Sequence, residues 1–197
     1  MIAHSIPVAA QKSTGLRIIA GAFKGRRLAA PPGLATRPLP DRVKQALFDW
    51  LGQRLDGLSV ADCCAGSGAF TFEALSRGAR RVDAIEPGQH ALPVLRANAA
   101  HLGGPAGLVI HARGFEDVLP RLRDVDLIFC DPPFPWYADG GREIAALLRL
   151  GTAALARDGR LVIRGERDAD LPAPPEGLVE AERRAYGRSW LALLRRV

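Results

Sequence analysis

The tetrad Asp131-Pro132-Pro133-Phe134, which directly follows the apolar segment 125–130, has the clearest chemical potential in the sequence. The amino group of a nucleobase is a poor nucleophile, because its lone pair is delocalised into the ring. The carboxylate of Asp131 and the backbone carbonyl of Pro132 can each accept one N–H of such an amine and direct its lone pair at an electrophilic methyl group. The prolines hold that carbonyl rigid, and Phe134 offers a face on which the base can stack. The tetrad therefore predicts methyl transfer to a nucleobase amine. The structural alternative is a strand end closed by a Pro-Pro turn, with Phe134 in the core.

A second candidate is the glycine-containing segment Asp62-Cys63-Cys64-Ala65-Gly66-Ser67-Gly68, between a short apolar run and a helical pattern. Glycines at the end of a strand let the backbone turn sharply and approach a ligand closely. Glu86 ends the next expected strand, 18 residues after Gly68, where a carboxylate can accept hydrogen bonds from two ribose hydroxyls. The pair predicts a nucleoside cofactor, the alternative being a tight turn followed by a helix with an acidic first residue.

The spacing of the glycines distinguishes between two nucleoside cofactors. The fingerprint of NAD-binding proteins has a third glycine three residues after Gly68, but this sequence has Thr71 there. S-adenosylmethionine (SAM) has no pyrophosphate and needs no third glycine. We therefore expect SAM.

Alternating strands and helices must position these residues. Short apolar runs separated by helical patterns predict an α/β fold with a mostly parallel sheet and right-handed crossovers, to which a C-terminal hairpin adds an antiparallel strand. The expected strands are 58–61, 81–85, 108–111, 125–130, 160–164, 178–186 and 190–196, and the expected helices are 70–77, 89–102, 115–122 and 143–150.

The residues before this pattern predict a small hairpin-helix appendage over residues 16–57, preceded by a flexible tail over residues 1–15 and followed by the cofactor-binding domain over residues 58–197. The short apolar-basic runs at residues 16–20 and 26–29 predict a hairpin. A helix opens at Pro40-Asp41, and an apolar stripe runs along it, with Arg42 and Lys44 off that stripe. Gly57 ends the segment.

The positive charge of the chain is concentrated at this end. The net charge of +6 divides into +7 on residues 1–55 and −1 on the remaining residues. A basic segment joined to a nearly neutral domain favours a polyanionic partner, most simply a nucleic acid. A solvated basic face without a partner is the alternative.

Composition excludes several classes of protein. With 197 residues and 48% hydrophobic residues, the chain can bury a full core and is not broadly disordered. No apolar run has the ~18 residues that cross a membrane, and the first ten residues make a poor signal peptide. Three cysteines without a Cys-x-x-Cys or His-x-x-x-His pair suggest neither a disulfide framework nor a metal site. We expect a cytoplasmic protein.

Taken together, these motifs are similar to class I SAM-dependent methyltransferases and resemble most closely the RsmD family of bacterial 16S rRNA (guanine-N2)-methyltransferases. The resemblance extends from about Arg17 to the C-terminus. The Asp-Pro-Pro-Phe tetrad is shared with other amino-methyltransferases, so the N-terminal motifs are the more specific part. The matching motifs are Arg17-Ile18-Ile19-Ala20-Gly21, Lys24-Gly25-Arg26, Thr36-Arg37-Pro38, Asp41-Arg42-Val43, Ala46-Leu47-Phe48, Ala65-Gly66-Ser67-Gly68, Glu73-Ala74-Leu75-Ser76-Arg77-Gly78-Ala79, Glu86 and Asp131–Phe134.

The resemblance implies a Rossmann-like class I methyltransferase fold with a seven-stranded sheet, and a role for each candidate residue. The catalytic residues would be Asp131, Pro132 and Phe134. The SAM-binding residues would be Asp62, Ala65, Gly66, Ser67, Gly68, Glu86, Pro87, Gly114 and Phe115. The RNA-contacting residues would be Lys24, Arg26, Arg27, Arg37, Arg42, Phe134 and Trp136. The implied partner is 16S rRNA or the small ribosomal subunit, bound by a monomer without a metal ion.

Two positions depart from the family pattern. Leu39-Pro40 stand where the family usually has Thr-Thr after Arg-Pro, so a hydroxyl contact is lost. Arg113 stands where many relatives have an acceptor for the adenine amine, and arginine cannot accept a hydrogen bond. We therefore expect backbone groups and the Phe115 side chain to hold adenine.

Three readings stay open from the sequence. The first is the rRNA methyltransferase. Another is an amino-methyltransferase that acts on DNA adenine or cytosine, or on a protein glutamine, and the third is a non-catalytic RNA-binding assembly factor on this fold. In the segment after the tetrad, Trp136 and Tyr137 have two interpretations. They belong either to a mobile lid whose aromatic rings stack on the substrate or to an ordinarily packed loop.

Overall fold

The computed structural model describes residues 15–31, 41–138 and 140–197 of the chain. The predicted tail before Gly15, the candidate Arg37 and the Leu39-Pro40 pair lie outside the described residues. The elements are α1 (Asp41–Leu51), β1 (Ser59–Asp62), α2 (Ala69–Ser76), β2 (Arg81–Ile85), α3 (Ala91–His101), β3 (Leu108–His111), α4 (Phe115–Val118), η1 (Leu119–Arg121), β4 (Val125–Cys130), η2 (Phe134–Tyr137), α5 (Arg142–Ala154), β5 (Leu155–Glu166), β6 (Leu178–Tyr186) and β7 (Ser189–Arg196).

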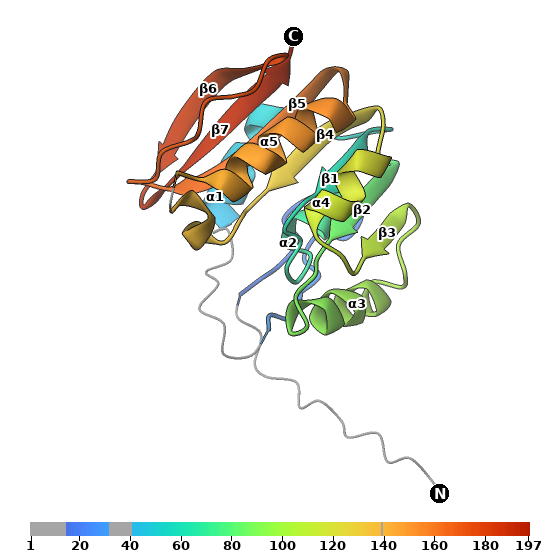
Figure 1. Ribbon diagram of the computed structural model, residues 1–197. Coiled ribbons are helices and arrows are strands. Elements are labelled where there is room, and N and C mark those ends of the chain that lie inside the picture. Colours follow the sequence, from blue (N-terminus) through green and yellow to red (C-terminus); the bar gives the residue numbers. More distant parts are fainter. Residues whose placement is uncertain (1–14, 32–40, 139) are drawn as a thin grey trace, which may run out of the picture.

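The strands form one seven-stranded sheet in the order β3-β2-β1-β4-β5-β7-β6 (Figure 1). The strands β1 to β5 pair in parallel, whereas β7 runs antiparallel to both of its neighbours. The predicted fold class, a mostly parallel α/β sheet with a C-terminal antiparallel strand, is confirmed. Strand order reverses between β1 and β4, and open parallel sheets bind ligands outside the carboxyl ends of the strands at such a point.

Helices cover both faces of the sheet, so successive residues of a strand enter two different cores. On one face Val60, Leu127 and Val162 pack with residues of α1, α2 and α3. On the other face Ile128 and Ile163 pack with residues of α4, η1 and α5. This burial on both faces explains why the strands read as short continuous apolar runs.

The predicted N-terminal hairpin is present as a set of backbone hydrogen bonds around one antiparallel bridge, between Arg17 and Arg27. The N–H of Ile18 donates to the carbonyl of Arg26 over 3.0 Å, and the N–H of Leu28 donates to that of Leu16 over 2.9 Å. Leu16, Ile18 and Leu28 are buried in the same core as α1 and α2. The described part of segment 16–57 therefore shares its core with the sheet.

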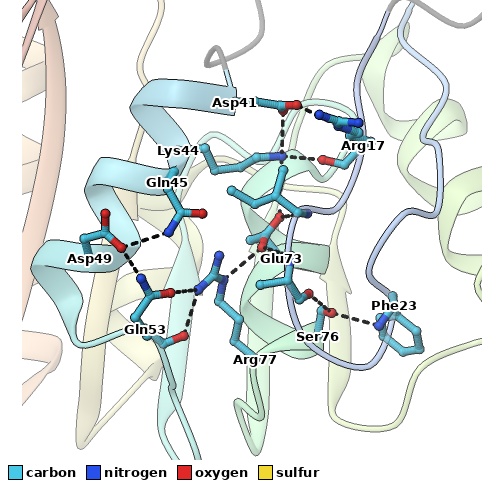
Figure 2. Close-up of polar contacts among 12 residues, drawn as sticks. Arg17, Phe23, Asp41, Lys44, Gln45, Asp49, Gln53, Glu73, Ser76 and Arg77 are labelled. Atoms are coloured by element: carbon cyan, nitrogen blue, oxygen red, sulfur yellow. Dashed lines mark hydrogen bonds and ion pairs between the residues drawn. The ribbon is translucent and has the colours of Figure 1, made fainter.

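One buried carboxylate, that of Glu73 on α2, joins the hairpin and α1 to this layer (Figure 2). Its two oxygens accept the N–H groups of Ile19 and Ala20 over 2.9 and 3.1 Å. Nε of Arg77 donates to it over 2.9 Å, and Nζ of Lys44 lies 3.4 Å away. Glu73 is fully buried and Lys44 is 1% exposed. Two cations and two backbone donors thus share one carboxylate.

The position of Lys44 corrects the sequence prediction. We expected Lys44 to lie off the apolar stripe of its helix, but its side chain points into the protein and also donates to the backbone carbonyl of Arg17. Its long aliphatic stem can be buried because carboxylate and carbonyl oxygens surround the ammonium group. Periodicity does not detect this case, since the partners come from distant segments.

Several predicted boundaries also change. The strand expected from residue 160 begins at Leu155, because Leu155 already pairs with Val125. The helix expected over 115–122 is divided into α4 and η1, with Pro120 in the 3-10 segment. In the described residues no helix is long and apolar enough to cross a membrane.

We predict that Glu73→Gln lowers the free energy of unfolding by about 3–5 kcal/mol, because it leaves the buried guanidinium of Arg77 without a counter-charge and the ammonium of Lys44 with only Asp41, 3.7 Å away. The amide nitrogen would also face groups that donate hydrogen bonds. Denaturant unfolding measures the change, and Glu176→Gln at an exposed turn is the matched control, expected to be within about 0.5 kcal/mol of wild type. Equal stability of the two variants would contradict this account.

Candidate active site

Three carboxylates lie at the carboxyl ends of adjacent parallel strands. Asp62 ends β1, Glu86 directly follows β2, and Asp131 directly follows β4. The strand order β2-β1-β4 places them along one edge of the sheet, at the point where strand order reverses. The structure therefore brings together the three acids that the sequence analysis selected separately.

Glu86 holds the glycine loop in place. Its Oε2 accepts the N–H of Gly66 over 2.7 Å, and its Oε1 accepts that of Gly88, also over 2.7 Å. Each carboxylate oxygen can accept a second hydrogen bond, so these contacts leave acceptor capacity for the hydroxyls of a ribose.

The loop between β1 and α2 requires glycine at position 68, because Gly68, the N-cap of α2, has a positive φ of 89°. A Cβ atom there would lie 2.3 Å from Cε2 of Phe72. The loop is also tied to α3, because Nδ2 of Asn98 donates to the carbonyl of Ser67 over 2.9 Å. The same amide pairs with both backbone groups of Ala29, in the hairpin. The sequence analysis did not identify Asn98.

Asp62 is a buried carboxylate with one oxygen unsatisfied. Its Oδ2 accepts the N–H and the hydroxyl of Thr71, over 3.1 and 2.7 Å, whereas Oδ1 has no partner among the described residues. Burial raises the pKa of Asp62 to about 7, against the lowering effect of the Thr71 hydrogen bonds. An unpaired buried acceptor beside a glycine loop fits an external donor such as the ammonium of a methionine moiety. The residues present therefore fit SAM.

Asp131 pairs with Arg164, a residue that the sequence analysis did not select. Nη1 of Arg164 lies 3.1 and 2.9 Å from the two carboxylate oxygens. Nε and Nη2 of the same guanidinium donate to Oγ of Ser189 over 3.2 and 3.1 Å. Burial raises the pKa of Asp131, and the charge and hydrogen bonds of Arg164 oppose that rise.

The residues after Asp131 lead into the 3-10 helix η2. Pro132 is buried, whereas Phe134 is 36% exposed, and Cζ of Arg164 lies 5.5 Å from the centroid of its ring. Phe134 is thus available to a stacking base and does not lie in the core, which was the alternative reading.

The aromatic residues that follow are packed against the protein. Trp136 contacts Phe115, with the ring centroids 5.5 Å apart, and the hydroxyl of Tyr137 donates to the carbonyl of Arg164 over 2.7 Å. Of the two readings of this segment, the structure therefore favours loop packing. Phe115, which directly follows Gly114, is itself in the core and only 2% exposed.

The remaining candidates are at the surface. Pro87 and Arg113 are exposed, and so are Lys24, Arg26, Arg27 and Arg42. Arg26 also donates to the carbonyl of His101 at the end of α3. Within the described ranges, no group of three or more His, Cys, Asp or Glu residues could hold a metal ion.

Residues 16–195 match a protein family described as "Conserved hypothetical protein 95". The chain is 32% identical over 160 residues to Ribosomal RNA small subunit methyltransferase D of Escherichia coli, covering 81% of this chain and 79% of the relative. It is 36% identical over 164 residues to the protein of the same name from Haemophilus influenzae, covering 81% and 83%.

Solved structures agree with this result. The hypothetical protein TTHA0928 of Thermus thermophilus has a TM-score of 0.74 and 30% identity, covering 90% of this chain and 97% of that one. The rRNA methyltransferase aviRa of Streptomyces viridochromogenes has a TM-score of 0.63 and 18% identity, covering 85% and 88%, and shows the fold alone. With most of its length matched at the level of family, sequence and fold, the chain belongs to the RsmD family and has the class I methyltransferase fold.

Proposed function

We propose that the protein transfers a methyl group from SAM to the exocyclic N2 amine of a guanine in 16S rRNA. The observation that carries the proposal is the Asp131 carboxylate, held at the carboxyl end of β4 with the exposed Phe134 three residues further on. It lies on the same sheet edge as Asp62 and Glu86. The names of the relatives, which are small-subunit rRNA methyltransferases, support the choice of substrate.

SAM, when bound, supplies an electrophilic methyl group on a sulfonium centre. We assign its ribose to Glu86, and its methionine moiety to Gly66, Ser67 and Gly68, with the ammonium group at Oδ1 of Asp62. Ala65 and Pro87 flank these contacts in the chain. Gly114 and Phe115, at the start of α4, are the residues that we assign to adenine.

The target amine is oriented by the tetrad. The Asp131 carboxylate accepts one N–H and the Pro132 carbonyl accepts the other, so the nitrogen lone pair points at the methyl group. Both acceptors also stabilise the positive charge that develops on nitrogen as its bond to the methyl group forms. The bond from that methyl group to sulfur breaks and leaves a neutral thioether, and the nitrogen then releases one proton, through Asp131 or to water. Phe134 stacks on the base, and Trp136 supports the turn from its contact with Phe115.

Residues 16–57 are proposed to contact RNA, and residues 58–197 to bind SAM and carry out the transfer. The exposed side chains of Lys24, Arg26, Arg27 and Arg42 provide the positive charge, together with Arg37 from outside the described residues. The partner would be 16S rRNA or an assembled small subunit in the cytoplasm, bound by a monomer.

The proposal predicts label in N2-methylguanosine when methyl-labelled SAM and the protein are incubated with small ribosomal subunits from unmodified cells. Bulk rRNA and DNA are offered in parallel, and each is digested to nucleosides. Asp131→Asn should reduce the rate by about 10²-fold or more, because the amide offers a weaker acceptor to the amine. Asp117→Asn, at an exposed position of α4, is the matched control.

If labelled methyl groups appeared in DNA alone, the protein would be a DNA amino-methyltransferase instead. If Asp131→Asn had no effect on the function of the protein in ribosome assembly, the non-catalytic assembly factor would be the better account. Label in another nucleoside of rRNA would keep the reaction and discard the N2 position.

The buried Asp62 predicts that SAM affinity depends on pH. Its pKa of about 7 means that the carboxylate, which pairs with the ammonium group, is lost as pH falls below that value. Between about pH 7.5 and 5.5, calorimetry should record an affinity that falls by up to about tenfold per pH unit. Asp62→Asn should bind SAM weakly, with an affinity that does not change over this pH range. A wild-type affinity that is constant over this range would refute the assignment.

The basic surface predicts a separate loss of RNA affinity. The quadruple substitution of Lys24, Arg26, Arg27 and Arg42 by Ala should weaken RNA binding and reduce its salt dependence, because fewer counterions are released. SAM affinity should stay at the wild-type value. Substituting the exposed Arg96, Arg121, Arg123 and Arg149 by Ala is the control with the same change in net charge. Equal losses in the two variants would argue against a specific RNA-contacting surface.

A further inference from the structure

Arg164 is a buried arginine that lies next to the tetrad. Its side chain is 9% exposed, although it ends the apolar run Leu161-Val162-Ile163 of β5. Burying a guanidinium is unfavourable unless its donors are paired. Here the guanidinium donors are directed to Asp131 on one side and Ser189 on the other.

The register of the sheet produces this arrangement. Cys130 pairs with Ile163 in the parallel ladder of β4 and β5, so Asp131 and Arg164 are the next residues along adjacent strands. Phe129 and Val162 precede them by two residues and lie in the core with α1, α2 and α3. Alternation therefore places both charged side chains on that same face, at the edge where the tetrad begins.

We propose that Arg164 is a positioning residue, anchored by Ser189, that fixes the orientation of the Asp131 carboxylate toward the target amine. The inference rests on the proposed function, in which Asp131 accepts a hydrogen bond from that amine. Arg164 does not itself touch the substrate in this account.

The contact geometry leaves Asp131 able to act. A single nitrogen, Nη1, contacts both carboxylate oxygens, and a carboxylate has about four acceptor positions. Lone pairs therefore remain for the amine. Because Nε and Nη2 both donate to Ser189, the guanidinium plane cannot rotate freely. Its Nη1 therefore restricts the orientation of the Asp131 carboxylate as well.

Arg164 also supplies the counter-charge for a carboxylate that is partly removed from water. Within the described part of the chain, the other titratable groups that face Asp131 are Asp62 from β1, Cys130 from β4 and Tyr137 from η2. The thiol of Cys130 in turn contacts Cys64. None of them is a cation. Removing the charge of Arg164 would therefore raise the pKa of Asp131 further, so the carboxylate would be lost at a higher pH.

Three variants separate the effect of the Arg164 charge from the effect of its orientation on Asp131. Arg164→Gln removes both, Arg164→Lys keeps the charge without the planar fork, and Ser189→Ala removes the anchor only. Arg160→Gln, at a partly buried arginine four residues before Arg164 in β5, is the matched control. For each full-length protein we would measure kcat, KM for the RNA substrate, SAM affinity, thermal unfolding and the pH dependence of kcat. The carboxyl resonance of Asp131 would be titrated by NMR, assigned with Asp131→Asn.

Arg164→Gln should lower kcat by about 10²-fold, with KM and SAM affinity within about twofold of wild type, and the acid limb of its rate profile should move to higher pH. Arg164→Lys should retain the wild-type acid limb but lose about tenfold in kcat. Ser189→Ala should lose a few-fold in kcat with the limb unmoved. In the NMR titration, the pKa of Asp131 should be higher in Arg164→Gln than in wild type.

The inference is overturned if Arg164→Gln keeps the wild-type kcat. It is also overturned if this variant loses kcat while the acid limb of its rate profile and the titration of Asp131 stay as in wild type, which is what a merely structural residue would produce. Should Arg164→Gln unfold, Arg164→Lys and Ser189→Ala decide, and wild-type kcat in both would overturn it. If wild type methylates no RNA, the proposed function fails. Separately, an Asp131 titration in Arg164→Gln that matches wild type would overturn the link between Arg164 and Asp131.

Discussion

The arrangement of the N-terminal half depends on a single buried carboxylate. Glu73 binds the backbone of the hairpin, the ammonium of Lys44 and the guanidinium of Arg77 (Figure 2). A carboxylate without such donors would be very unfavourable in this core, and each donor would be unfavourable without the carboxylate. The interaction therefore specifies where the hairpin and α1 pack on α2, the helix that follows the glycine loop.

The acids at the sheet edge have the same chemistry but different surroundings. Glu86 is engaged by backbone N–H groups, Asp62 by a threonine that leaves one oxygen unsatisfied, and Asp131 by a cation. Surroundings of this kind distinguish the roles of otherwise equivalent carboxylates. The proposed division into ribose acceptor, ammonium partner and amine acceptor follows from these differences.

Much of this arrangement was predictable from local pattern. The strands 81–85, 108–111 and 125–130 were predicted with their observed bounds, because buried parallel strands have continuous apolar sequences. The glycine loop and the acids at strand ends followed from the same reasoning. Lys44, Asn98 and Arg164 were not recognised, since each acquires its role from partners that are far away in the chain. For Arg164 the one local signal was an arginine at the end of a buried strand.

The N-terminal segment is connected to the glycine loop more directly than an appendage would be. Asn98 on α3 binds the backbone of Ala29 in the hairpin and the carbonyl of Ser67 in the glycine loop, and Arg26 binds the end of the same helix. A displacement of the hairpin would therefore break contacts that also orient the loop. If the basic hairpin binds RNA as proposed, the base and the methyl donor are positioned by one rigid unit, which is the condition under which orientation contributes most to a transfer rate.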